Sequence, residues 1–93
     1  MARFWKITGY NSDEIEFECR VPEGALSETA MIALLQRLAA RHLEADEVVS
    51  SSLRRNASGY TSHLEVRRNA DGSPSLMTTG TGHYYMATIQ EGD

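Results

Sequence analysis

The sequence is poor in cysteine and lysine, and it has no long apolar run. Cys19 is its single cysteine, so no disulfide can form within the chain. Its place in an apolar alternating segment predicts a small buried side chain and not a reactive thiol. No stretch approaches the roughly 18 apolar residues of a membrane-spanning helix, and no signal-peptide core follows residues 1–6. We therefore expect a cytoplasmic protein without a membrane partner.

Basic residues are also scarce. The sequence has nine Lys and Arg residues but 13 Asp and Glu residues, so its formal net charge is -4. Nucleic-acid binders present a basic domain or face, so this balance argues against a nucleic-acid partner. Eight of the nine basic residues are Arg and ten residues are Ala, a composition typical of GC-rich bacterial genomes. The length of 93 residues, with 41% hydrophobic and 24% charged residues, predicts one small globular domain.

Motifs that carry a specific chemistry are missing. The sequence shows no nucleophile–base pair, no closely spaced set of metal ligands and no nucleotide-binding fingerprint. We therefore expect no cofactor and no metal, and the balance favours a protein that is not an enzyme.

Two N-terminal segments, residues 3–10 and 15–21, are predicted strands. The second segment alternates four apolar residues on one face with three charged residues on the other: Ile15, Phe17, Cys19 and Val21 against Glu16, Glu18 and Arg20. We expect a three-residue loop between the strands, which sets Lys6 opposite Glu18 and keeps both faces consistent.

A helix is predicted after the break at residues 22–24. Ser27 is its expected N-cap, and the helix ends near Leu43. Its apolar seam has helical spacing: Met31, Leu34, Leu35 and Leu38. Residues 48–53 are β-branched and then serine-rich, which indicates a weak strand, with continuation of the helix as the alternative.

The C-terminal half contains three more predicted strands, residues 60–67, 76–79 and 83–90, separated by a loop at 69–74 and a turn at 80–82. The element order is therefore ββαβββ. Segregated strands and helix predict an α+β fold in which one amphipathic helix packs on an antiparallel sheet.

The histidines are the first candidate binding residues. His42 falls in the apolar seam near the helix end, where it is either a hydrogen-bonded structural residue or a base or ligand facing a pocket. His63 and His83 lie on different predicted strands, and strand parity sets His63 on a face with Thr61 and Glu65, which opposes a shared metal site. Two tyrosines follow His83, so His83, Tyr84 and Tyr85 together form a candidate binding segment.

Two arginine pairs, Arg54–Arg55 and Arg67–Arg68, are the second set of candidate binding residues. Together with the tyrosines they could recognise RNA or an acidic partner. If the strands around residues 57–58 pair with each other, the two arginine pairs fall at opposite ends and form no compact patch.

These observations favour a non-catalytic protein-interaction or assembly module, which binds a protein partner or itself through a sheet edge. Residues 82–89 are the expected edge strand, because they carry no acidic residue or Lys to discourage pairing. The alternatives are a small ligand-binding or catalytic domain using His42 and His83, and then a nucleic-acid or acidic-partner binder using the arginines.

Overall fold

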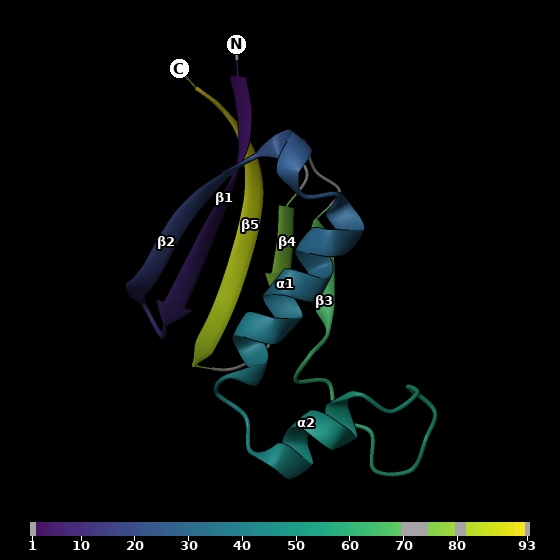
Figure 1. The fold of residues 1–93 in the computed structure, drawn as a ribbon. Coiled ribbons are helices and arrows are strands. Elements are labelled where there is room, and N and C mark those ends of the chain that lie inside the picture. Colours follow the sequence, from purple (N-terminus) through teal and green to yellow (C-terminus); the bar gives the residue numbers. More distant parts are fainter. Residues whose placement is uncertain (1, 70–74, 80–81, 93) are drawn as a thin grey trace.

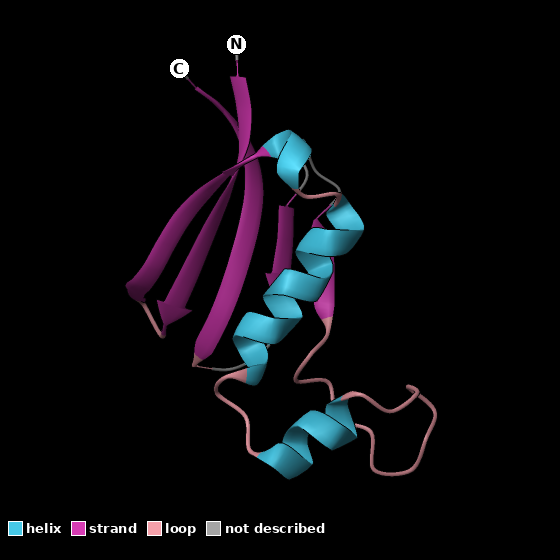
Figure 2. Cartoon of the chain, in the orientation of Figure 1, coloured by secondary structure: helices cyan, strands magenta, loops and turns pink. Residues whose placement is uncertain are grey.

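The computed structural model describes residues 2–69, 75–79 and 82–92, which form an α+β fold (Figure 1). Its strands are β1 (Ala2–Asn11), β2 (Glu14–Pro22), β3 (Val66–Asn69), β4 (Ser75–Thr78) and β5 (His83–Gly92). Its helices are η1 (Glu23–Ala25), a 3-10 turn, and the α-helices α1 (Glu28–Ala40) and α2 (Ala45–Ser51). The predicted fold class is confirmed, with α2 as an additional helix (Figure 2). The predicted loop at 70–74 and turn at 80–81 lie outside the described residues.

The strands form an antiparallel sheet in the order β2-β1-β5-β4-β3. The expected edge strand, residues 82–89, is therefore wrong: β5 lies in the centre of the sheet and pairs with both β1 and β4. The lack of charge in this segment reflects a strand with two neighbours, since charges are the usual protection of an edge. The true edges are β2 and β3, and both carry charged residues.

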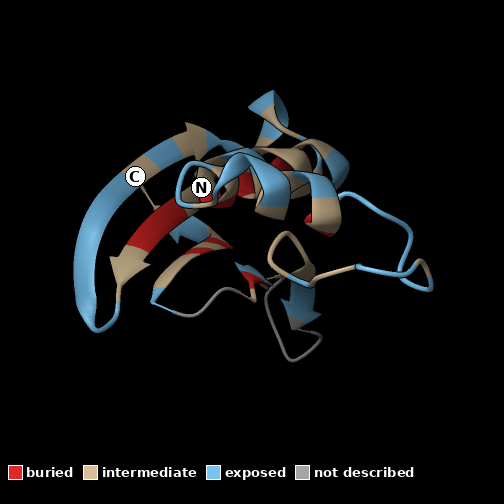
Figure 3. Cartoon of the chain, turned by 90° about the horizontal axis from the view of Figure 1, so that it is seen from below, coloured by how far each residue is buried: buried red, intermediate tan, exposed pale blue. Residues whose placement is uncertain are grey.

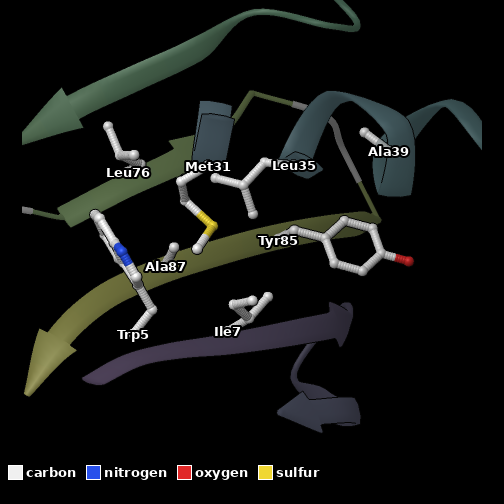
Figure 4. Close-up of a cluster of buried hydrophobic side chains, with 8 residues drawn as sticks. All are labelled: Trp5, Ile7, Met31, Leu35, Ala39, Leu76, Tyr85 and Ala87. Carbon is white, nitrogen blue, oxygen red and sulfur yellow. The ribbon is translucent and has the colours of Figure 1, made fainter. Parts of the chain in front are cut away.

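Helix α1 begins at the predicted cap, where the Ser27 hydroxyl accepts a hydrogen bond from the Ala30 amide at 3.1 Å. It ends at Ala40, three residues before the predicted end, and residues 41–43 continue as a turn. One face of α1 is buried against the sheet, over β5, β4 and β3. The core joins this face to side chains of β1, β4 and β5 (Figure 4): Trp5, Ile7, Met31, Leu35, Ala39, Leu76, Tyr85 and Ala87.

Residues 45–51 form a helix where a weak strand was expected over 48–53. Acidic residues occupy the first turn of α2, where the helix dipole favours them. The Glu47 carboxylate also accepts a hydrogen bond from the Glu44 amide at 2.9 Å, one half of a capping box. These local signals favour a helix more strongly than the two valines at 48–49 favour a strand.

The predicted strand at residues 60–67 begins only at Val66. Before it, hydrogen bonds between side chains hold the segment in place. The Thr61 hydroxyl bonds to the hydroxyls of Ser50 and Ser51 at 2.9 Å and 2.8 Å, and the Tyr60 hydroxyl donates to the Glu65 carboxylate at 2.7 Å. The segment is therefore tied to α2 as a series of turns.

The β1–β2 hairpin has a two-residue turn and a bulge, in place of the predicted three-residue loop. Gly9 pairs with Phe17 but Tyr10 pairs with Ile15, so Glu16 is an extra residue in β2. Beyond the bulge, the register differs from the prediction by two residues, and Lys6 lies opposite Arg20. The side chains of Lys6 and Glu18 still meet diagonally, at 3.9 Å.

Because of the bulge, the β2 residues before it and the β2 residues after it alternate in opposite phase between the two sides of the sheet. Phe17 and the apolar residues that follow it lie opposite Gly9, Ile7 and Trp5, on the side that carries α1. Ile15 lies opposite Tyr10 and so belongs to the side of the sheet away from α1. The prediction that Ile15 shares a face with Phe17 is wrong, and Ile15 is 59% exposed.

Candidate functional site

Two candidate histidines meet at the end of the sheet where α1 finishes. The rings of His42 and His83 are stacked, with centroids 3.9 Å apart and planes 6° from parallel. The His42 Nε2 atom lies 2.7 Å from the hydroxyl of Tyr85, whose ring is buried in the core. The sequence reasoning did not predict this contact, because its parity argument compared residues on strands only. Here one histidine comes from the turn after α1 and the other from β5.

The bulged residue Glu16 completes this histidine cluster, which we define as Glu16, His42, His83 and Tyr85. The Glu16 Oε2 atom lies 3.5 Å from His83 Nδ1, and Oε1 accepts a hydrogen bond from the Asn11 side chain at 3.1 Å. His83 Nδ1 is shielded from solvent and has no hydrogen bond within the described residues. Glu16 therefore faces this nitrogen as an ion-pair partner when the ring is protonated.

The histidine cluster disfavours a positive charge on His42. Desolvation of the ring lowers its pKa below the ordinary value of 6.5. Repulsion from His83 and Arg41 acts in the same direction, and attraction to Glu16 opposes it. Within the described residues, no group of three or more possible metal ligands comes together.

Tyr84 lies on the other side of the sheet, away from Tyr85 and the histidines. Its ring stacks on Tyr10 of the neighbouring strand, with centroids 4.7 Å apart. Tyr84 also borders a shallow groove of about 530 Å³ on this side, together with Arg67, Met77 and Met86. The segment 83–85 is thus divided between two faces and forms no single binding surface.

The four arginines are separated as well. Arg55 contacts Glu65 at 3.2 Å beside α2, whereas Arg68 of β3 contacts Glu28 of α1 at 3.3 Å. Arg54 is exposed in the segment after α2, and Arg67 lies at the groove. The structure therefore does not bring the two arginine pairs into one basic patch.

The β2 edge is a different kind of surface. β2 has nine residues and pairs with β1 along one side only. Within the described residues, residues 14–21 make no hydrogen bond between two main-chain groups other than those to β1. Seen from below in Figure 3, β2 is the exposed outer ribbon, and the helices lie over other strands. Phe17 is 38% exposed although it faces the side that carries α1.

Two features of these surfaces escaped the sequence reasoning. Glu16 and Asn11 join the histidine cluster only because of the bulge, and no residue in the hairpin marks a bulge at that position. The β2 edge was missed because the uncharged residues 82–89 favoured a different strand as the edge. A comparison of the number of strands with the single predicted helix could have indicated an uncovered strand.

Comparison with family models, with curated proteins and with solved structures finds no significant match. Along the part of the chain that the structure describes, no helix is both long and apolar enough to cross a membrane. The surfaces of the molecule are therefore the basis on which its function is inferred.

Proposed function

We propose that this protein is a non-catalytic assembly module that binds a protein chain by strand addition at the β2 edge. The observation that carries the proposal is the length of this edge, nine residues with main-chain groups available along one whole side. An added strand satisfies these groups with ladder hydrogen bonds, and its alternating side chains provide specificity.

The dimensions of the fold support an uncovered strand at this edge. Five strands spaced about 4.8 Å apart span about 19 Å, whereas one helix with its side chains is about 10–12 Å wide. Helix α1 packs over β5, β4 and β3, at the opposite end of the sheet from β2. Cys19 and Val21 of β2 are partly buried against the core, whereas Phe17 lacks such cover and is 38% exposed.

The opposite edge is a poorer site for strand addition. β3 has four residues, from Val66 to Asn69, and two of them are arginines. Both edges carry charged residues, but a very short edge strand offers few main-chain groups and resists pairing with other chains. This difference supports β2 as the edge that binds.

Residue-resolved hydrogen–deuterium exchange tests the proposal, with protein concentrations from about 1 μM to about 1 mM. Amides in β2 that point toward β1 should be protected throughout, and the alternate amides should gain protection as concentration rises. The amides of β3 provide the matched comparison and should not change. If exchange of the outward-facing β2 amides is independent of concentration, strand addition between copies of this chain is contradicted.

The histidine cluster supports a second candidate, a small-ligand or catalytic site using His42 and His83. The supporting observation is Glu16, a carboxylate placed to orient His83 as a base would require. A fragment screen that follows the histidine ring signals by NMR tests this alternative. Binding that shifts both rings and is lost in His83→Asn supports it, whereas unshifted rings across the screen count against it.

A further inference from the structure

We infer that the strand added at the β2 edge belongs to a second copy of this chain, paired antiparallel about a two-fold axis at Cys19. The inference rests on the proposed strand addition and specifies its occupant and its register. It is carried by one segment, residues 17–21, whose two halves have complementary side chains when two copies of the segment pair antiparallel.

The two faces of β2 restrict the possible registers. Residues directly opposite each other in an antiparallel pair lie on the same side of the sheet. If α1 of both copies lies on one side, apolar residues meet apolar residues and charged residues meet charged residues. A shift by a single residue instead sets Glu18 and Arg20 beside the apolar row of the other copy, which is unfavourable.

Charge then selects among the remaining registers. With Cys19 at the axis, Glu18 of each copy lies opposite Arg20 of the other, giving two cross-strand pairs of opposite charge. A shift of two residues in one direction sets Glu18 opposite Glu18, and the same shift in the other direction sets Arg20 opposite Arg20. Like charges directly opposite each other destabilise a strand pair. Among these registers, the one centred on Cys19 has no such repulsion.

The apolar side follows the same register. Phe17 of each copy lies opposite Val21 of the other, and the two Cys19 residues face each other. Phe17 is 38% exposed in the single chain, and a second copy would cover it. The bulge favours this pairing, because it directs the Glu16 carboxylate to His83 and keeps its negative charge out of this five-residue segment.

Charge reversal tests the register. Glu18→Arg and Arg20→Glu each create two repulsive pairs and should weaken dimerisation about 10- to 100-fold. An equimolar mixture of the two variants restores both pairs of opposite charge, so it should form a heterodimer of nearly wild-type affinity. Sedimentation velocity measures the affinities, native mass spectrometry identifies the heterodimer, and circular dichroism checks that each variant is folded.

The mixture also separates the interface from effects within one chain. Glu18→Arg removes the contact with Lys6, and Arg20→Glu removes the contact of the guanidinium with the Phe4 ring. Both variants keep these losses in the mixture. Recovery of dimer on mixing therefore reports contacts between chains.

Cys19 provides an independent reporter of the axis. Opposed residues have Cα atoms about 4.5–5.5 Å apart, within the range that a disulfide bridges. Because the chain has one cysteine, diamide as oxidant should link two wild-type chains through it. The matched control is Cys19→Ser combined with Val21→Cys. It keeps a cysteine on the same face, but the new cysteines lie four residues apart across the interface and should not cross-link.

Three results would refute three separate claims: the register, the second copy as the added strand, and the Glu18–Arg20 pairing. A dimer with protected β2 amides that neither responds to charge reversal nor cross-links at Cys19 leaves strand addition standing and refutes the register. A monomer at every concentration, in which the outward-facing β2 amides stay unprotected, refutes the second copy as the added strand but not strand addition by a different protein chain. A mixture of variants that dimerises no better than either alone refutes the Glu18–Arg20 pairing.

Discussion

Gly9 occupies a position in β1 that has no room for a side chain. A Cβ atom added there would lie 2.6 Å from Cε2 and 3.0 Å from Cδ2 of Tyr85, and 3.2 Å from the Cβ atom of Phe17. Tyr85 is 5% exposed, and its hydroxyl is bonded to His42, so the ring cannot move aside without losing packing and a hydrogen bond. We predict that Gly9→Ala destabilises the protein.

The expected size of the effect combines two opposing contributions. Forcing a methyl group into a packed region costs about 1–3 kcal/mol. Replacing glycine in a strand returns about 0.5–1 kcal/mol, because the unfolded chain becomes less flexible. We therefore expect a net loss of about 1–2 kcal/mol in the free energy of unfolding. For a domain of this length, the melting temperature should fall by about 5–15 °C.

Urea denaturation followed by circular dichroism measures the loss, and a double-mutant cycle identifies its cause. Tyr85→Val removes the ring atoms nearest to Gly9 and leaves only the 3.2 Å contact with the Phe17 Cβ atom, so Gly9→Ala should cost clearly less in that background. Gly24→Ala is the matched control, since an added Cβ atom there meets nothing within 4 Å. An equal cost of Gly9→Ala with and without the Tyr85 ring would refute the reasoning.

Three further predictions concern the helix and the histidines. Ser27→Ala should lower the free energy of unfolding by about 0.5–2 kcal/mol, because the N-cap hydrogen bond is lost. Ser27→Asp should keep most of the wild-type stability, because Asp also caps helices. Equal stabilities of the two variants, measured by chemical denaturation, would contradict the capping role. Leu35→Ala should cost about 2–5 kcal/mol, because a fully buried side chain of α1 is removed, and chemical denaturation measures this. The pKa of His42, followed by NMR titration, should lie below 6.5 and rise in His83→Asn. Since the folded state then binds fewer protons than the unfolded state, unfolding free energy should fall as pH drops through 6.5 and level off below the folded pKa; a rise over that interval would contradict this sign.

Local patterns were sufficient to predict the fold class. Alternation over residues 15–21, helical spacing after Ser27 and the strand-forming residues of 76–79 and 83–90 each indicated the correct type of element, whereas most of the predicted strand at 60–67 was wrong. The arrangement of the strands was not accessible from local patterns, because β5 pairs with β1 across most of the chain. The same uncharged sequence fits an unprotected edge or a central strand, and only the order of the sheet distinguishes them.

Prediction of the histidine cluster likewise required knowledge of contacts between residues distant in the sequence. His42 and His83 are brought together because the end of α1 lies over the start of β5. Sequence reasoning could identify both histidines as unusual residues. It could not identify Glu16 as their neighbour, because regular alternation sets that residue on the opposite face.

The bulge at Glu16 connects the two surfaces. In a regular strand, Glu16 would extend the charged row of Glu18 and add a negative charge beside the proposed interface. The extra residue instead turns Glu16 to the side of α1, where Asn11 and His83 hold its carboxylate. Residues 17–21 are left with one negative and one positive charge, symmetric about Cys19, and this symmetry is what a strand requires to pair with a copy of itself. One inserted residue therefore supplies the carboxylate of the histidine cluster and leaves a balanced segment at the edge.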